Sequence, residues 1–197
     1  LGEISPLGSA ANPFTGKLLG RLNYKNQKAT ITADIKGSGN QALIAFLNGG
    51  TIKNIIFKGT VTADEKRSAA GIVACAKSGE MNNCENYADI NIKYSGNSLS
   101  YSGGIVGYTE MPAALKIINC VNNGVITHKS KYNSYSGGII GYFNGRSSAN
   151  SLIDCANKGD IVSEGICGGV AGYVSRPNAV SLCANFGEIS SKKYASG

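Results

Sequence analysis

The sequence predicts an all-β protein folded as a single-stranded parallel β-helix of about five to six turns. Three observations support this prediction: a repeated cysteine segment, a repeated glycine segment, and columns of constant residue character between the copies. The cysteine segment has the pattern C-x-N-x-(G/A)-x-I and begins at Cys84, Cys120, Cys155 and Cys183. The glycine segment has the pattern G-G-(I/V)-x-G-Y and occupies 103–108, 137–142 and 168–173. Self-similarity at this period is typical of stacked repeats, in which each copy contacts only its neighbours.

The apolar columns predict strands. The cysteine position is filled in order by Ile55, Cys84, Cys120, Cys155 and Cys183, at spacings of 29, 36, 35 and 28 residues. Six positions later the chain carries Val61, Ile90, Ile126, Ile161 and Ile189. These apolar runs are short, β-branched and bounded by Gly, Asn and Ser, which favours strands over helices. Neighbouring copies run in the same direction, so we expect parallel pairing and, from the usual hand of parallel crossovers, a right-handed coil.

Polar and glycine columns predict the corners of this coil. One column contains Asn86, Asn122, Asn157 and Asn185, whose amides are expected to hydrogen-bond from turn to turn. Another contains Gly59, Gly124, Gly159 and Gly187, together with Ala88, and is expected to need positive φ or close backbone approach. The glycine pairs before each Ile/Val column are expected to form a second corner.

Length and composition predict one domain. From where the repeats begin, residues 1–40 are expected to form an entry turn and N-terminal cap, and residues 41–197 the repeats. The chain has 197 residues and 42% hydrophobic content, enough for a real core. No apolar run approaches the roughly 18 residues of a membrane span, so direct membrane insertion is not expected. The net charge of +7 comes from scattered Lys and Arg without a dense basic run, so no nucleic-acid partner is expected. A solvated basic surface and attraction to acidic glycans are the two interpretations of this charge.

The repeats resemble the GLUG-motif repeats of bacterial surface adhesins and of the β-helical region of IgA-specific metallopeptidases. The residues that support the resemblance are the glycine segments, the asparagine–cysteine segments that follow them, and the opening stretches 13–18, 28–31 and 48–54. It covers nearly the whole chain from Asn12 onward. The resemblance implies an exported, cell-surface β-helix, part of a longer surface protein, that acts as an adhesin or a stalk. Because the chain starts at Leu1 and shows no signal-peptide segment, we expect a leader to have been removed.

Tyrosines are the candidate binding residues. One column contains Tyr108, Tyr142 and Tyr173, with Phe46 in the equivalent earlier place, and its rings are expected to form a ladder along one face. The segments before the glycine pairs, expected to be loops, add Tyr94, Tyr101, Tyr132 and Tyr135. An exposed ladder would offer an apolar platform to a host or bacterial surface glycan or protein. The alternative is a structural ladder that packs under the adjoining loops.

The cysteines allow three interpretations: a buried thiol ladder, disulfides between turns, or a metal site. The spacing lacks the C-x-x-C or C-x-x-H patterns of zinc sites, and no metal or cofactor is expected. The thiol ladder is favoured, because the four column cysteines stand among Ile-type neighbours. Cys75 falls in the tyrosine column and Cys167 in a serine column, so these two are expected to be exposed.

Catalytic groups are few. His128 is the only histidine, so the H-E-x-x-H motif is absent, and it is expected to be an incidental surface residue. Asp160 and Glu188 are aligned carboxylates on adjacent turns, which leaves a carbohydrate-active enzyme as an alternative. The prediction favoured by the sequence is a non-catalytic surface adhesion or interaction module, and a passive spacer is the third alternative.

Overall fold

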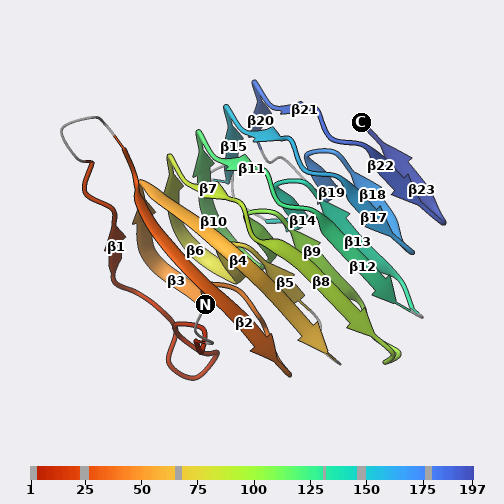
Figure 1. The fold of residues 1–197 in the computed structure, drawn as a ribbon, viewed down its shortest axis with the longest axis horizontal. Helices are drawn as coiled ribbons and strands as arrows, with labels where there is room; N and C mark the ends of the chain where they lie inside the picture. The colour runs from red at the N-terminus through yellow and green to blue at the C-terminus, as the bar shows by residue number, and fades with distance from the viewer. Residues whose placement is uncertain (1–3, 23–26, 65–67, 131, 146–149, 176–178) are drawn as a thin grey trace.

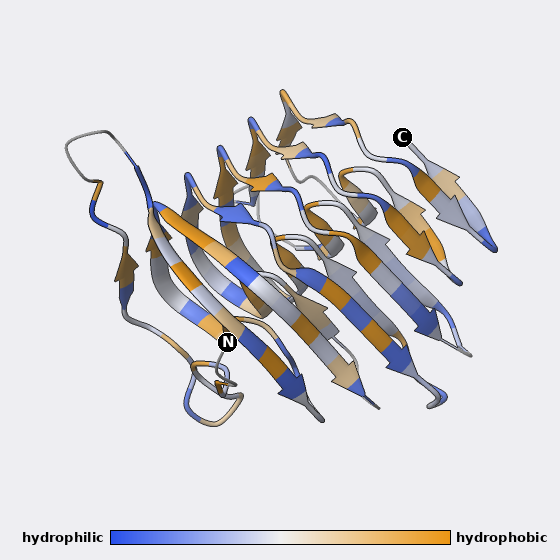
Figure 2. Ribbon diagram, in the orientation of Figure 1, coloured by the Kyte–Doolittle hydropathy of each residue, from blue (hydrophilic) through white to orange (hydrophobic). Residues whose placement is uncertain are grey.

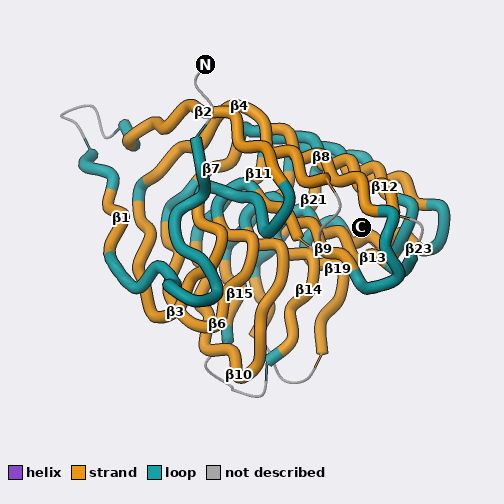
Figure 3. Tube along the Cα trace, turned by 90° about the horizontal axis from the view of Figure 1, so that it is seen from below, coloured by secondary structure: helices purple, strands orange, loops and turns teal. Residues whose placement is uncertain are grey.

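The computed structural model describes residues 4–22, 27–64, 68–130, 132–145, 150–175 and 179–197. Within these residues the chain consists of strands and connecting turns, without a helix (Figures 1 and 3). Every strand pair is parallel. The sheets stack as a β-solenoid of about 5 turns, which confirms the predicted fold class. No helix among the described residues has the length and apolar character of a membrane span.

Three parallel sheets run along the solenoid, and each complete turn visits them in the same order. Sheet 1 contains β1 (Lys17–Leu19), β3 (Ile44–Lys53), β6 (Val73–Asn82), β10 (Val106–Ile118), β14 (Ile140–Asn144), β15 (Ser151–Ile153), β19 (Ala171–Ser175) and β20 (Ala179–Ser181). Sheet 2 contains β2 (Ala29–Gly37), β4 (Ile55–Asp64), β7 (Glu85–Asn86), β8 (Asp89–Tyr94), β11 (Val121–Asn122), β12 (Ile126–Ser130), β16 (Ala156–Asn157), β17 (Ile161–Ser163), β21 (Ala184–Asn185) and β22 (Ile189–Ser191). Sheet 3 contains β5 (Ser68–Ala70), β9 (Ser100–Gly103), β13 (Ser134–Gly137), β18 (Ile166–Gly168) and β23 (Tyr194–Ser196).

The core follows from strand alternation and from the repeat register. Along β8 exposed and buried residues alternate, as the period of two in a strand requires, and Figure 2 shows apolar segments recurring from strand to strand. Ile52, Met81 and Ile117 lie in register on consecutive turns and are fully buried. Consecutive turns therefore share one continuous apolar cluster, as the columns predicted.

The asparagine column forms the predicted ladder. Asn86 Nδ2 donates to Asn122 Oδ1 at 2.8 Å, Asn122 donates to Asn157 at 2.8 Å, and Asn157 donates to Asn185 at 2.7 Å. Each Nδ2 also donates to the carbonyl two residues further on, at 2.7–2.9 Å. The interior amides are thus satisfied within the protein, as buried polar groups require.

The glycine pairs and the asparagine ladder touch across the solenoid. A Cβ on Gly104 would lie 2.2 Å from Asn122 Cγ, and one on Gly138 would lie 2.3 Å from Asn157 Cγ. Real Cβ atoms do not approach side chains so closely, so only glycine fits opposite each ladder amide. The glycine pairs, which were predicted to form the second corner, therefore leave the space that the asparagine side chains of the first corner occupy.

The structure separates the two explanations offered for the other glycine column. Gly59 has φ of 125°, but Gly124 and Gly159 are explained by close approach, because a Cβ on either would lie 2.0 Å from a carbonyl oxygen of the preceding turn. Positive φ recurs instead just before the cysteine column. The residues there are Asn54, Asn83, Asn119, Asp154 and Leu182, with φ of 57°, 56°, 51°, 53° and 54°. Asn and Asp tolerate this left-handed conformation better than most residues do.

The N-terminal segment continues the stacking. β1 pairs with β3 and β2 pairs with β4, both in parallel, so each extends its sheet by one strand. Leu7 and Phe14 form single bridges to Ile44 and Leu47 at the same edge of sheet 1. The division of the chain at residue 40 stays a prediction.

We expect Asn122→Ala to lower the free energy of unfolding by roughly 2–4 kcal/mol, because it removes two ladder bonds in a buried site. Urea unfolding followed by circular dichroism measures the change. Asn123→Ala is the matched control: Asn123 Nδ2 has no hydrogen-bond partner among the described residues. We expect that control to change stability by no more than about 0.5 kcal/mol. Equal losses in the two variants would contradict a stabilising ladder.

Candidate functional site

Five tyrosine rings gather where sheet 3 meets sheet 1, and we call Tyr101, Tyr108, Tyr135, Tyr142 and Tyr173 the tyrosine cluster. Tyr101 and Tyr135 are in register on β9 and β13. The other three are in register on β10, β14 and β19, which confirms the predicted column. The two rows interlock: the centroids of Tyr101 and Tyr108 lie 4.9 Å apart, and those of Tyr135 and Tyr173 lie 5.3 Å apart.

The rings of the cluster cover much of one another's faces. Tyr142 and Tyr173 are nearly parallel, with centroids 4.8 Å apart and an interplanar angle of 6°. Tyr142 also meets Tyr101 at 5.1 Å and Tyr135 at 5.4 Å in tilted contacts. Four of the rings are partly buried and Tyr173 is 39% exposed. The cluster thus combines both expectations for the ladder, since its rings stack on each other and remain in part accessible to solvent.

The other two candidate tyrosines lie outside the cluster. Tyr94 is only 9% exposed, because it ends β8 on the inward face, and its hydroxyl lies 3.0 Å from Ser98 Oγ. Tyr94 therefore offers a ligand little of its ring, and its role in binding stays a prediction. Tyr132 follows β12 and is 45% exposed. Tyr101 and Tyr135 were expected in loops, but both belong to strands of sheet 3.

The two cysteines expected to be exposed are buried. Cys75 is in register with Phe46 on one side and Tyr108 on the other, and Cys167 is in register with Ser136. Both predicted columns are correct. Cys75 is too short to reach past Phe46 and Tyr108, whereas Cys167 is buried because the side chains of the serine column face inward. Cys75 is fully buried, and burial raises the pKa of its thiol to about 12. Burial likewise raises the pKa of the adjacent Tyr108 hydroxyl well above its usual range.

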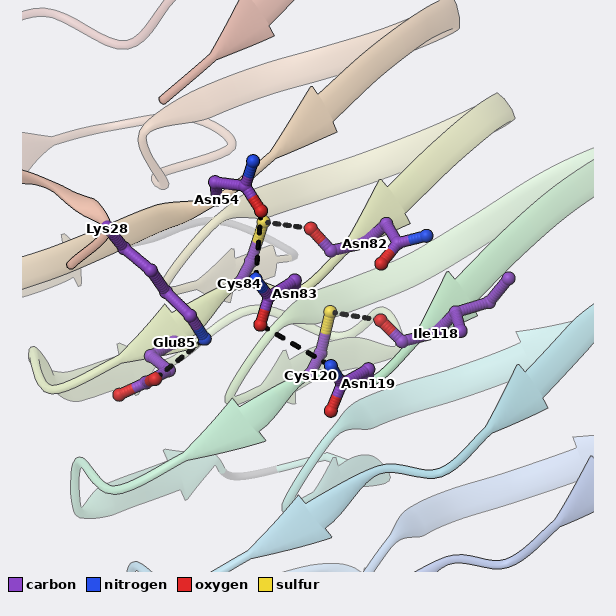
Figure 4. A network of polar contacts seen from close by, with 9 residues as sticks. All are labelled: Lys28, Asn54, Asn82, Asn83, Cys84, Glu85, Ile118, Asn119 and Cys120. Atoms are coloured by element: carbon purple, nitrogen blue, oxygen red, sulfur yellow. Dashed lines mark hydrogen bonds and ion pairs between the residues drawn. The ribbon is translucent and has the colours of Figure 1, made fainter. Parts of the chain in front are cut away.

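The four column cysteines form the predicted thiol ladder. All six cysteines are free, and Cys84, Cys120 and Cys155 are buried while Cys183 is half-buried. Cys84 Sγ lies 3.4 Å from Asn82 O, and Cys120 Sγ lies 3.3 Å from Ile118 O (Figure 4). Among the described residues no group of three or more His, Cys, Asp or Glu side chains is placed to hold a metal ion. The ladder lies beside the left-handed asparagines, where Asn83 Nδ2 donates to Asn54 Oδ1 at 2.8 Å.

His128 was expected at the surface, and this expectation is wrong. It lies on β12 with no exposed area, and its Nε2 is 2.9 Å from Ser100 Oγ. Its Nδ1 lies 3.0 Å from Ser102 Oγ and 3.1 Å from Ser136 Oγ. Burial lowers the pKa of the imidazole to about 3, so the ring is neutral at physiological pH. The strand period gives the signal that was missed: His128 stands two residues after the core residue Ile126 and so shares its face.

Serines extend this polar interior between sheets 2 and 3. Ser102 Oγ donates to Ser136 Oγ at 2.9 Å, and Ser136 Oγ donates to Ser163 Oγ at 3.0 Å. Ser102 and Ser136 come from the two Tyr-Ser-Gly-Gly segments, while Ser163 ends β17. Alternate residues of those segments face opposite ways: tyrosine outward to the cluster and serine inward to His128. The repeats therefore position the candidate site and the buried network together.

The aligned carboxylates hold neighbouring turns together. Asp160 Oδ1 accepts a hydrogen bond from the Glu188 backbone N–H at 2.8 Å. Asp89 accepts from the Val125 N–H at 3.0 Å, and Asp34 accepts from the Thr60 N–H at 3.0 Å. The same turn-to-turn bond thus recurs along the column, and the Asp160 carboxylate has a structural partner in the backbone at Glu188.

Comparison with protein-family models, with curated proteins and with solved structures finds no match to this chain. The class that the geometry defines is a parallel β-solenoid with a tyrosine cluster on its surface.

We expect acid to destabilise the protein through His128. The folded-state pKa is lowered, so the unfolded chain takes up the proton first, and stability that is full above pH 6.5 falls as the pH drops toward 3. The slope from this residue is about 1.4 kcal/mol per pH unit. Urea midpoints at pH 7, 5.5 and 4 measure it, with His128→Asn as the comparison because both proteins share the carboxylates. Parallel pH profiles for the two proteins would contradict the buried neutral imidazole.

We expect iodoacetamide to label Cys183 before the other five cysteines, because Cys183 alone among the six is not fully buried. Peptide mass spectrometry after timed labelling of the folded protein gives the order, and labelling in urea gives the unprotected reference. Early labelling of Cys75 would contradict its place between the rings.

Proposed function

We propose that this chain is a non-catalytic interaction module of the surface-adhesin type, which engages a partner glycan or protein through the tyrosine cluster. The observation that supports the proposal most strongly is the cluster itself: five partly accessible rings from two sheets, held on consecutive turns of a rigid scaffold. Tyrosine combines a large apolar ring with a hydroxyl, and it is enriched where proteins bind partners.

The resemblance to GLUG-motif repeats supports a place for this module outside the cell, as part of a longer surface protein. A solenoid suits that place, because its turns succeed one another along one axis (Figure 1). The cluster crosses several turns, so it presents a strip along that axis.

The alternative of a carbohydrate-active enzyme is supported less well. Such enzymes need a carboxylic acid and a carboxylate that flank the scissile bond. Asp160 instead accepts a backbone hydrogen bond from Glu188 itself. His128, the single imidazole in the sequence, is enclosed by serine hydroxyls.

A passive spacer is the second candidate, and the stacking of the rings on one another favours it. Rings that pack in register contribute to stability without any ligand. The variants described next separate a spacer from a binding module, because a spacer loses stability and nothing else.

The test is an array of neutral and acidic host and bacterial glycans probed with the purified chain. We expect saturable binding to one class and at least a roughly tenfold loss in Tyr101→Ala/Tyr135→Ala, which removes one row of the cluster. Tyr132→Ala is the matched control, since Tyr132 is exposed and outside the cluster. Circular dichroism confirms that each variant folds. Binding that survives removal of the row would contradict the proposed surface, and a blank array would direct the search to a protein partner.

A further inference from the structure

A second surface lies on sheet 2, outside the asparagine ladder. The residues that follow the ladder positions form a column, which we call the corner ridge: Lys58, Tyr87, Asn123, Lys158 and Phe186. Its members are exposed except Asn123, which is half-buried. Their backbones are tied together, because the Tyr87 N–H donates to Phe57 O at 2.8 Å and the Lys158 N–H donates to Asn122 O at 2.7 Å. Strand alternation explains the exposure: each ladder amide points inward, so the next side chain points outward.

The ridge combines cations with an accessible ring. Lys58 and Lys158 are exposed, and Tyr87 is 45% exposed. Lys58 Nζ lies 5.4 Å from the centre of the Tyr87 ring, within the range of a cation–π contact. At the ordinary spacing of strands in a parallel sheet, three turns separate the backbones of Lys58 and Lys158 by about 14 Å, and Tyr87 stands on a turn between them.

The carboxylates next to the ridge have partners within the protein: Asp89 and Asp160, two residues after Tyr87 and Lys158, accept backbone hydrogen bonds from the following turns. Glu85 Oε1 pairs with Lys28 Nζ at 2.7 Å (Figure 4), and both side chains are largely buried. Among the described residues neither Lys58 nor Lys158 has an ion-pair partner within 4.0 Å. The ammonium groups of Lys58 and Lys158 are therefore accessible to an anion in solution.

We propose that the corner ridge binds an acidic polysaccharide that lies along the solenoid axis. Carboxylates of the sugar pair with Lys58 and Lys158, and one sugar ring packs on Tyr87. This goes beyond the function proposed for the tyrosine cluster, because the ridge lies on a different sheet and involves none of the cluster residues. It also uses two of the lysines that contribute to the net positive charge of the sequence.

Single-stranded nucleic acid fits the ridge less well. It binds proteins by stacking successive bases on aromatic side chains along a positively charged groove. Tyr87 and Phe186 are separated on the ridge by Asn123 and Lys158, so successive bases would find no successive rings. A polysaccharide needs only spaced cations and one ring.

The experiment titrates the whole chain with an oligogalacturonate hexamer by isothermal calorimetry, with maltohexaose as the neutral probe. We expect saturable binding to the acidic probe alone, weakened by added salt. We expect Lys58→Gln/Lys158→Gln and Tyr87→Ala each to weaken it about three- to tenfold. Lys93→Gln/Lys129→Gln removes the same charge from exposed positions on β8 and β12, and Tyr132→Ala removes an equally exposed ring; both should stay within about twofold of the wild type.

Four outcomes would overturn the proposal. They are no binding of the acidic probe, equal losses in the ridge and control lysine variants, equal binding of a single-stranded oligonucleotide of the same charge, and insensitivity to Tyr87→Ala. Tyr101→Ala/Tyr135→Ala keeps the two proposals apart. If it abolishes binding and the ridge variants do not, the acidic sugar belongs to the tyrosine cluster, and only the ridge assignment fails.

Discussion

The contact between the asparagine ladder and the glycine pairs is the constraint on which the rest of the structure depends. The interior ladder amides of Asn122 and Asn157 bond to the turns before and after them, and Asn86 and Asn185 end the ladder, which sets the register along the axis. Across the solenoid, the same side chain fills the space that a Cβ on the facing glycine would occupy. The ladder asparagine therefore fixes both the spacing between turns and the distance between the two facing sides of the solenoid. This explains why the cysteine–asparagine segment and the glycine segment recur together.

Once the register is fixed, several other columns become ladders of like side chains. Cysteine stacks on cysteine, serine on serine and tyrosine on tyrosine, each in the environment that its face of the strand provides. The Tyr-Ser-Gly-Gly segments show the consequence most clearly. Tyr101 turns outward to the cluster while Ser102 turns inward to His128, so the surface candidate and the buried polar network are two faces of one strand. The repeat register that stabilises the fold therefore also repeats the surface tyrosines from turn to turn.

Much of the fold could be predicted from the sequence because the period is visible in it. The parallel register, the asparagine ladder, the thiol ladder and the tyrosine column all follow from which residues recur at equivalent positions. Apart from Tyr101 and Tyr135, which were expected in loops and lie in strands, the errors concerned the environment of single side chains. Cys75 was placed in the correct column but was expected to be exposed, since the alignment does not show how far its neighbours extend. His128 was placed at the surface although the strand period puts it on the face of Ile126.

The contact between the two rows of the tyrosine cluster could not be predicted from the repeat columns. Tyr101 and Tyr108 stand in different columns, and the register says nothing about the angle at which sheet 3 meets sheet 1. That angle is set at the glycine pair between them, and it decides whether the two rows of rings meet. The recurrence of positive φ before the cysteine column was also missed, although Asn54, Asn83 and Asn119 offered the residue type that favours it.

The most direct test of this account is hydrogen exchange of the asparagine side-chain amides, followed by nuclear magnetic resonance. If the ladder holds the turns together, the Nδ2 protons of Asn86, Asn122 and Asn157 exchange as slowly as the backbone amides of the adjoining strands. Exchange at the rate of an exposed asparagine such as those in the loops would contradict the ladder, and with it the constraint that positions the tyrosine cluster.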